Sequence, residues 1–343
     1  MSDIRLERHT HSATNMHSRQ LNRKISLLSS NDRRIRKKDA LEKFIESHQT
    51  LVITGLSQLR HNILIEGLAK DDSGFCPYRV YVWSILLRIP PMKAQTYVDL
   101  VKAGKSKSFD KILNDIHRTL KGDKLLETRV SSEMLTRCLN SHALQIEAIQ
   151  HSGKNHQNLS PYVQGMNILA APFLCAAKSE PEAFALFSGL LTRYIPMYVV
   201  PTLTGVHTGV KLVDKCLEIV DPKLSQFLQS KLLQAEIYAL PSILTLCACT
   251  PPLVEVLELW DFLFAYGCHM NVLLVIAQMI LMRSKLLASK NPMTLLREFP
   301  PLQAKEVIKL AISFLPLIPD SLYELLCKHT HDPTVGNRLK DLE

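Results

Sequence analysis

The stretch that decides the fold is "PLVEVLELWDFLFAYG", residues 252–267. Its apolar side chains recur every three or four residues, which places them along one face of an α-helix. Gly267 follows the last apolar position, as is common where a helix ends. The stretch therefore predicts a helix with one buried face. The residues on that face are Leu253, Val256, Leu257, Trp260, Leu263 and Phe264.

The same spacing recurs along most of the chain, and signals for strands are nearly absent. Glycine is scarce, at 12 of 343 residues, and Asn-Gly or Asp-Gly hairpin turns are almost missing. We therefore expect an all-α protein. The clearest predicted helices lie at 40–48, 56–68, 78–87, 108–120, 132–150, 271–282, 303–315 and 321–328.

The positive charge of the chain is concentrated at its N-terminus. The formal net charge is +9, and residues 1–38 alone hold ten Lys and Arg against three Asp and Glu. These residues are polar and poor in aromatics, so we expect a disordered basic arm over 1–38. The arm could serve as a solvated linker, contact phosphates or carry a localisation signal. Ser26, Ser29 and Ser30 are weak candidates for phosphorylation.

A folded domain of near-neutral charge is expected over 39–343, beginning at Asp39 as an N-cap. No signal peptide is expected, because the first 40 residues are polar and basic. No transmembrane helix is expected either, since the longest strongly apolar run, residues 271–282, has 12 residues. A bilayer core of roughly 30 Å needs about 20.

The eight cysteines are scattered, without a CxxC motif or histidines at zinc-finger spacing. Cys247 and Cys249 in "LTLCACTPP" allow a metal site, but reduced buried thiols are the preferred reading. The chain is therefore expected to hold no metal.

Three short patterns carry candidate chemistry, and each has an ordinary structural explanation. An arginine and a tryptophan at i, i+4 could form a cation–π pair. An aspartate and an arginine at i, i+3 could form a surface ion pair. A glutamine before an apolar helix could be a cap. The patterns are R-x-x-x-W at Arg79 and Trp83, I-x-x-D-x-x-R at Ile112, Asp115 and Arg118, and Y-x-Q at Tyr162 and Gln164.

Together and in this order, the three patterns resemble the signature motifs of the TBC family, which comprises activating proteins for small GTPases, mostly Rabs. The resemblance runs from about Gly74 to Ala288 and includes "QGMNILAAPFL" and "ELWDFLFAYG". It implies a fold of about sixteen helices in two subdomains that form a V-shaped molecule. We place the subdomains at about 39–180 and 181–343.

The resemblance also implies that Arg118 and Gln164 act in trans, on GTP bound to a partner. A guanidinium supplies fixed positive charge to the transferring phosphoryl group. A glutamine amide both donates and accepts hydrogen bonds, so it can orient the attacking water. The chain is then a GTPase activator rather than an enzyme with its own substrate pocket. It would need no cofactor, because magnesium and GTP belong to the partner.

The neighbouring motif residues are expected to support these two fingers. Asp115 would orient the arginine loop, and Tyr162 would fix the loop that presents the glutamine. Gly165 would permit a close approach of backbones, while Arg79 and Trp83 would brace the helix behind. The family usually has glycine before the motif tyrosine, where this chain has Pro161. The chain also has "TLKGD" after Arg118 where many relatives have an aromatic after the threonine.

Two further stretches, "CPYRVYVWSILLRIP" and "YALPSILTL", resemble the TBC subunit of the fungal two-component checkpoint GAP. This resemblance implies a Ras-like GTPase of the mitotic-exit or septation network as substrate and a scaffold subunit as partner. It also implies a cytoplasmic protein concentrated at the spindle pole body. The alternatives are a non-catalytic binding module and a GAP for a trafficking Rab; nucleic acid is not expected as a main partner.

Overall fold

The computed structural model describes residues 49–70, 75–119, 122–153 and 158–340. Within these residues the ordered elements are helical, and no strand is present. The all-α prediction is confirmed. Two compact units are separable, Met1–Gly55 and Leu56–Glu343, and the second holds every motif residue. The predicted arm at 1–38 and the predicted helix at 40–48 lie outside the described residues.

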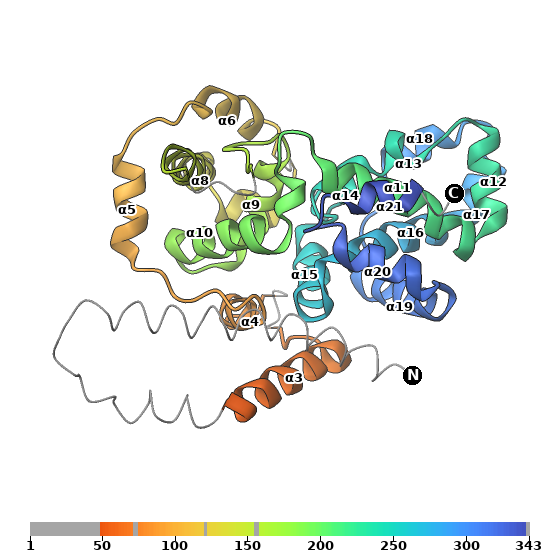
Figure 1. The fold of residues 1–343 in the computed structure, drawn as a ribbon, viewed down its shortest axis with the longest axis horizontal. Coiled ribbons are helices and arrows are strands. Elements are labelled where there is room, and N and C mark those ends of the chain that lie inside the picture. Colours follow the sequence, from red (N-terminus) through yellow and green to blue (C-terminus); the bar gives the residue numbers. More distant parts are fainter. Residues whose placement is uncertain (1–48, 71–74, 120–121, 154–157, 341–343) are drawn as a thin grey trace. The chain divides into compact units, whose positions relative to one another are not determined.

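The motif residues lie on the helices of the first half or in the loops between them. Figure 1 shows these helices. They are α3 (Gln49–Glu66), α4 (Arg79–Leu86), α5 (Ala94–Lys102), α6 (Phe109–Ile116), α7 (Lys124–Arg129), α8 (Ser132–His151), α9 (Met166–Ala176), α10 (Glu180–Gly189) and the π-helix η1 (Leu190–Tyr194). Helices α8, α9 and α10 pack against one another, and α6 packs on α8 and α9.

The second half is a succession of shorter and longer helices. They are η2 (Pro196–Tyr198), α11 (Thr204–Val220), α12 (Pro222–Ser230), α13 (Ala235–Tyr238), α14 (Leu240–Leu244), α15 (Leu253–Tyr266), η3 (Cys268–Met270), α16 (Asn271–Leu281), α17 (Arg283–Ala288), α18 (Pro292–Arg297), α19 (Ala304–Phe314), η4 (Leu315–Leu317), α20 (Asp320–Lys328) and α21 (Val335–Lys340). Helix α15 contacts α4 and α9 from the first half and α19 from the second, so it joins the two sets of helices.

Helix α15 is the stretch from which the fold was predicted, and it forms the centre of the core. It ends at Tyr266 with Gly267 as its C-cap, as the sequence predicts. Its Trp260 and Phe264 meet Trp83 of α4 and Phe173 of α9, with ring centroids 5.0 to 6.1 Å apart. Such aromatic contacts add to the stabilisation that burial of these rings provides.

Helix α6 is shorter than predicted. The apolar pattern predicts a helix to residue 120, but α6 ends at Ile116. The chain continues in tight turns, in which the amides of Arg118 and Thr119 donate to carbonyls three residues back. The Asn167 side chain also donates to the Asp115 carbonyl and to Thr119 Oγ1, at 3.3 and 3.0 Å. Tertiary contacts therefore override the local helical pattern here, and Arg118 lies beyond the end of the helix.

Of the cysteine pair that allowed a metal site, Cys247 lies in the protein interior and Cys249 is partly exposed. Cys247 is completely buried, and its thiol donates to Asn271 Oδ1 at 3.1 Å and accepts from Gln278 Nε2 at 3.2 Å. Burial raises the pKa of this thiol. A buried thiol with a raised pKa stays protonated, which makes it a poor metal ligand.

The apolar run at 271–282 forms the buried helix α16, which packs on α11 and α19. None of the helices in the described residues combines the length and the apolar character that crossing a lipid bilayer requires.

One buried carboxylate predicts a pH-dependent stability. Asp214 of α11 accepts the amide of Ala235, and burial raises its pKa to about 6 from an ordinary value near 3.8. A raised folded-state pKa means that stability is lost as pH rises from about 4 through 6. We expect Asp214→Asn, which keeps an acceptor but carries no charge, to be more stable than the wild type at pH 7.5. The gain is on the order of 1 kcal/mol once solvent screening is allowed for.

Urea unfolding of both proteins at pH 4 and pH 7.5 checks this prediction. The two midpoints should come closer together at pH 4, where Asp214 is protonated in the folded chain and about half protonated in the unfolded chain. A difference between the two proteins that stays constant with pH would contradict it.

Candidate functional site

The predicted arginine finger lies on the turn after α6 and points to the surface. Its side chain is 67% exposed, and Arg118 Nη2 donates to Asp115 Oδ1 at 2.7 Å. The ordinary explanation for this spacing, an i, i+3 ion pair, is therefore present in the structure. Asp115 is mostly buried, however, with 11% of its side chain exposed. The pair anchors an exposed guanidinium to a fixed, buried carboxylate.

Asp115 also holds the second motif loop. The Tyr162 hydroxyl donates to Asp115 Oδ2 at 2.7 Å, so the two oxygens of one carboxylate serve Arg118 and Tyr162 separately. Burial, and then the hydrogen bond to Asp115, raise the pKa of Tyr162, so the hydroxyl remains a donor at physiological pH. The carboxylate thus connects the arginine loop to the glutamine loop across 47 residues of sequence.

Gln164 occupies an exposed position at the end of this second loop. It immediately precedes Gly165, the N-cap of α9, whose φ is +102°. A non-glycine residue adopts such a conformation only with strain. The amide is therefore presented at the surface by a turn that requires glycine, and it does not cap the helix itself.

Within the chain, a side chain lies close to Gly165. A Cβ atom at this position would lie 2.9 Å from Leu244 Cδ2 at the end of α14. Gly165 is needed both for its positive φ and for this contact. The close approach of backbones expected at Gly165 stays a prediction.

Asn167 is a second connection between the loops that sequence reasoning missed. Its Nδ2 donates to Thr119 Oγ1 beside the arginine finger, and its Oδ1 accepts from the Gly165 amide at 3.2 Å. The residue is 5% exposed. An asparagine inside the apolar stretch "GMNILAA" was the available signal, since buried amides need hydrogen-bond partners.

Arg79 and Trp83 are brought together, but not as a cation–π pair. Both donate to Asp261 of α15: Arg79 Nε to Oδ1 at 3.0 Å, and Trp83 Nε1 to the same oxygen at 2.8 Å. Arg79 Nε and Nη2 each reach Oδ2 at 3.2 Å. All three residues are at most 2% exposed. Burial raises the pKa of Asp261 to about 6, and the Arg79 charge opposes that shift.

Asp261 was missed in the sequence, where it is one of three acids in 253–264, with Glu255 and Glu258. It connects α4 to α15, the helix that carries the aromatic core. The bracing role expected for Arg79 and Trp83 therefore acts through a buried ion pair with this aspartate. Ile112, the remaining motif residue, is completely buried on α6 and takes part in packing only.

Asp123, a few residues after the arginine turn, accepts two backbone hydrogen bonds from different helices. Its Oδ1 accepts the Leu126 amide as the N-cap of α7, and its Oδ2 accepts the Leu253 amide at the start of α15, at 3.0 and 2.7 Å. Asp123, which follows the arginine turn, therefore connects the start of α7 to the start of α15. The sequence contains this aspartate in "TLKGD", but nothing local to it indicates the distant partner.

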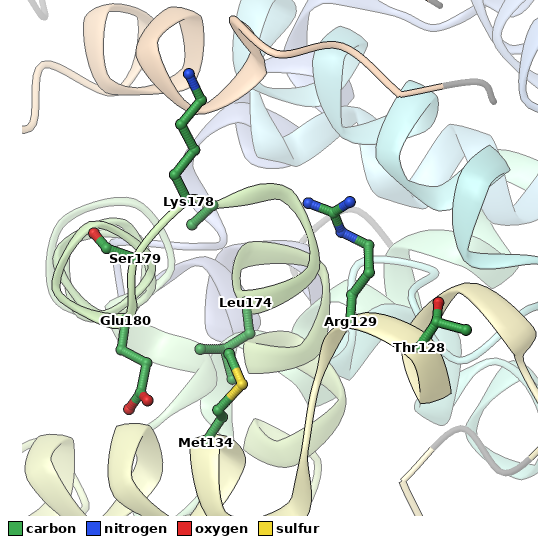
Figure 2. Close-up of a pocket in the computed structure, with 8 residues that line it drawn as sticks. Thr128, Arg129, Met134, Leu174, Lys178, Ser179 and Glu180 are labelled. Carbon is green, nitrogen blue, oxygen red and sulfur yellow. The ribbon is translucent and has the colours of Figure 1, made fainter. Parts of the chain in front are cut away.

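A pocket of about 530 Å³ lies away from these motifs, where α7, α8, α9 and α10 meet (Figure 2). Figure 2 shows the charged ends of Arg129 and Lys178 directed away from Met134 and Leu174. None of the motif residues lines it, and its Glu180 is engaged by Arg137 and Tyr97. The pocket is therefore separate from the finger site.

Comparison with known proteins identifies the family. The Rab-GTPase-TBC domain matches residues 76–287. The chain is 47% identical to the cell division control protein 16 of Schizosaccharomyces pombe, over 82% of this chain and 90% of that protein. It is 44% identical to the mitotic check point protein BUB2 of Saccharomyces cerevisiae, over 86% and 98%.

Solved structures support the same fold. The crystal structure of the Ypt/Rab-GAP domain of Gyp1p superposes with a TM-score of 0.60 at 17% identity, covering 81% of this chain and 98% of that domain. A likeness at such low identity bears on the fold alone. The domain match and the two relatives, together with the motif geometry, show that the chain is a member of the Rab-GTPase-TBC domain family.

Proposed function

We propose that this protein is a GTPase-activating protein that inserts Arg118 and Gln164 into the nucleotide site of a small GTPase. The observation that carries the proposal is the shared carboxylate of Asp115, which fixes the arginine turn and the glutamine loop to one another. The fingers themselves remain exposed. Preorganised charge is the main catalytic resource in phosphoryl transfer.

The proposed mechanism assigns a different task to each finger. The Arg118 guanidinium has donors besides Nη2 that can reach the transferring phosphoryl oxygens while Asp115 holds its stem. The Gln164 amide accepts from the attacking water and donates to a neighbouring oxygen. Magnesium and GTP belong to the partner in this scheme, and the chain contributes only side chains.

The assignment of a particular GTPase, partner and location rests on the relatives and on the sequence resemblance. One relative's name refers to cell division control and the other's to a mitotic check point. We infer that the substrate is a Ras-like GTPase of the mitotic-exit or septation network and that a scaffold subunit assists. The same inference places the protein in the cytoplasm and at the spindle pole body, which imaging of the tagged protein tests.

Single-turnover GTP hydrolysis tests the substrate assignment. The mitotic-exit GTPase, loaded with GTP, is mixed with this protein with and without the scaffold, and a panel of Rab proteins is run in parallel. Acceleration of the mitotic-exit GTPase supports the proposal, and a requirement for the scaffold makes this chain the catalytic half of a two-part activator. If only a trafficking Rab is accelerated, that Rab is the substrate instead. If no GTPase is accelerated, the result favours a binding module.

Tyr162→Phe is expected to weaken activation without unfolding the protein. The substitution removes the donor to Asp115 Oδ2, so the glutamine loop loses its hydrogen bond to the arginine turn. A hydrogen bond to a charged group stabilises by about 1.5–3 kcal/mol. If half of that bears on finger placement, the stimulated rate falls about three- to twelvefold.

Tyr97→Phe is the matched control, because the Tyr97 hydroxyl also donates to a carboxylate, Glu180, at 2.8 Å and away from the fingers. Single-turnover rates and urea midpoints are measured for both variants. Equal rates in the two variants would show that the Tyr162 hydroxyl supports only the fold.

A further inference from the structure

Three arginines near Tyr194 have no carboxylate partner among the residues that the structure describes. Arg88 lies two residues after the end of α4, Arg193 lies in η1, and Arg60 lies on α3. None of the three forms an ion pair with a carboxylate of the described residues. We call Arg60, Arg88 and Arg193 the arginine cluster.

One direct contact joins two members of the cluster, Arg193 and Arg88, and a second lies beside it. The Tyr194 hydroxyl donates to the Leu87 carbonyl at 2.5 Å, and Arg193 Nη1 makes a long contact of 3.4 Å with the Arg88 carbonyl. These contacts join the end of α4 to η1. Burial raises the pKa of the Tyr194 hydroxyl to about 12, and the charges of Arg88, Arg193 and Arg60 each oppose that rise, so all three lie in its electrostatic neighbourhood.

Arg60 is the member whose state most needs an explanation. Its Nε is buried and has no hydrogen-bond partner. Burial, and then the charge of Arg88, lower the pKa of Arg60. A guanidinium nevertheless remains protonated at physiological pH, so the cluster carries three positive charges. The nearby His331 adds none, since burial lowers its pKa.

An unpaired buried donor and three neighbouring like charges are unfavourable by themselves. Buried N–H groups ordinarily have partners, and like charges in a partly desolvated site repel one another. An anion with several acceptor oxygens would accept a hydrogen bond from the unpaired donor and would offset the repulsion between the positive charges. A phosphate monoester carries between one and a half and two negative charges at pH 7 and offers three acceptor oxygens, which suits guanidinium forks.

We propose that the arginine cluster binds a phosphorylated serine or threonine of a partner protein. Clusters of arginines are a recurrent means of reading phosphorylated motifs. The three charges share one neighbouring hydroxyl, that of Tyr194, whereas a nucleic acid requires a basic track along its backbone. The site is independent of the GTPase activity and contains none of the finger residues.

Inorganic phosphate is the first probe. The unfolding temperature of the full chain is measured in phosphate and in chloride at equal ionic strength. We expect phosphate to raise it for the wild type but not for the double variant Arg60→Gln/Arg193→Gln. Without an anion, the double variant should unfold at the same or a higher temperature, because it removes repulsion. If the double variant folds poorly, the single variant Arg193→Gln, at an exposed position, replaces it in the same measurement.

The second probe is a fluorescent degenerate peptide library with a central phosphoserine, compared with its serine and glutamate counterparts. We expect the phosphorylated library to bind at least tenfold more tightly than either. The double variant should lose that preference, while Arg297→Gln on α18, an exposed arginine outside the cluster, should keep it.

Equal binding of the three libraries, or an unchanged preference in the double variant, would overturn the proposal. Binding of a duplex oligonucleotide with the same arginine dependence, and no preference for the phosphopeptide, would also overturn it. Neither result depends on whether the protein activates a GTPase.

Discussion

Arg118→Ala is expected to reduce the stimulated rate of GTP hydrolysis by a factor on the order of 10³–10⁵ and to leave GTPase binding intact. An arginine finger accelerates hydrolysis by that much because it places fixed positive charge on the transferring phosphoryl group. Arg118 projects from the turn after α6, with Asp115 as its anchor. Single-turnover hydrolysis measures the rate, and titration with a labelled GTPase measures the affinity.

The fold should survive this change. The Arg118 guanidinium is two-thirds exposed, so losing its ion pair alters stability by at most about 1 kcal/mol. Arg118→Lys is the matched variant: it keeps a charge but lacks the planar fork, and should recover only part of the rate. A wild-type rate in Arg118→Ala, with normal unfolding, would rule out the assigned role.

Asp261→Ala is expected to be the most destabilising single change near the motifs. It leaves the Arg79 guanidinium buried without a counter-charge and removes the acceptor of Trp83. Breaking a buried pair in this way costs about 3–5 kcal/mol, a large share of the 5–15 kcal/mol that holds a typical domain together. Urea unfolding of the purified variant measures the loss.

A double variant distinguishes the lost pair from lost packing. Arg79→Met/Asp261→Leu removes both charges and keeps similar volumes, so it should recover most of the stability that Asp261→Ala loses. A double variant as unstable as Asp261→Ala would show that the carboxylate is needed for another reason, such as its contact with Trp83.

The sequence predicted the parts of this protein that depend on local pattern. The apolar spacing of 252–267 predicted α15 with its glycine end, because a helix that buries one face must show that period. The motif spacings predicted that Asp115 supports Arg118. Each of these features lies within one helix or one turn, where neighbours in sequence are neighbours in space.

The parts that the sequence did not predict depend on partners far along the chain. The pairing of Arg79 with Asp261 spans 182 residues, and the Asp123 contact with Leu253 spans 130. The end of α6 at Ile116 likewise depends on Asn167, whose side chain holds the following turn. Helical periodicity carries no information about such contacts, so the pattern predicted a longer helix and a local cation–π pair.

The measurement that tests the central claim most directly uses a GTPase whose own catalytic glutamine has been replaced by leucine. The account predicts that this protein still accelerates single-turnover GTP hydrolysis on that variant, because Gln164 supplies the missing amide, and that Gln164→Ala abolishes the acceleration. Acceleration of the unmodified GTPase alone, undiminished by Gln164→Ala, would contradict the claim that the exposed amide before Gly165 enters the partner's active site.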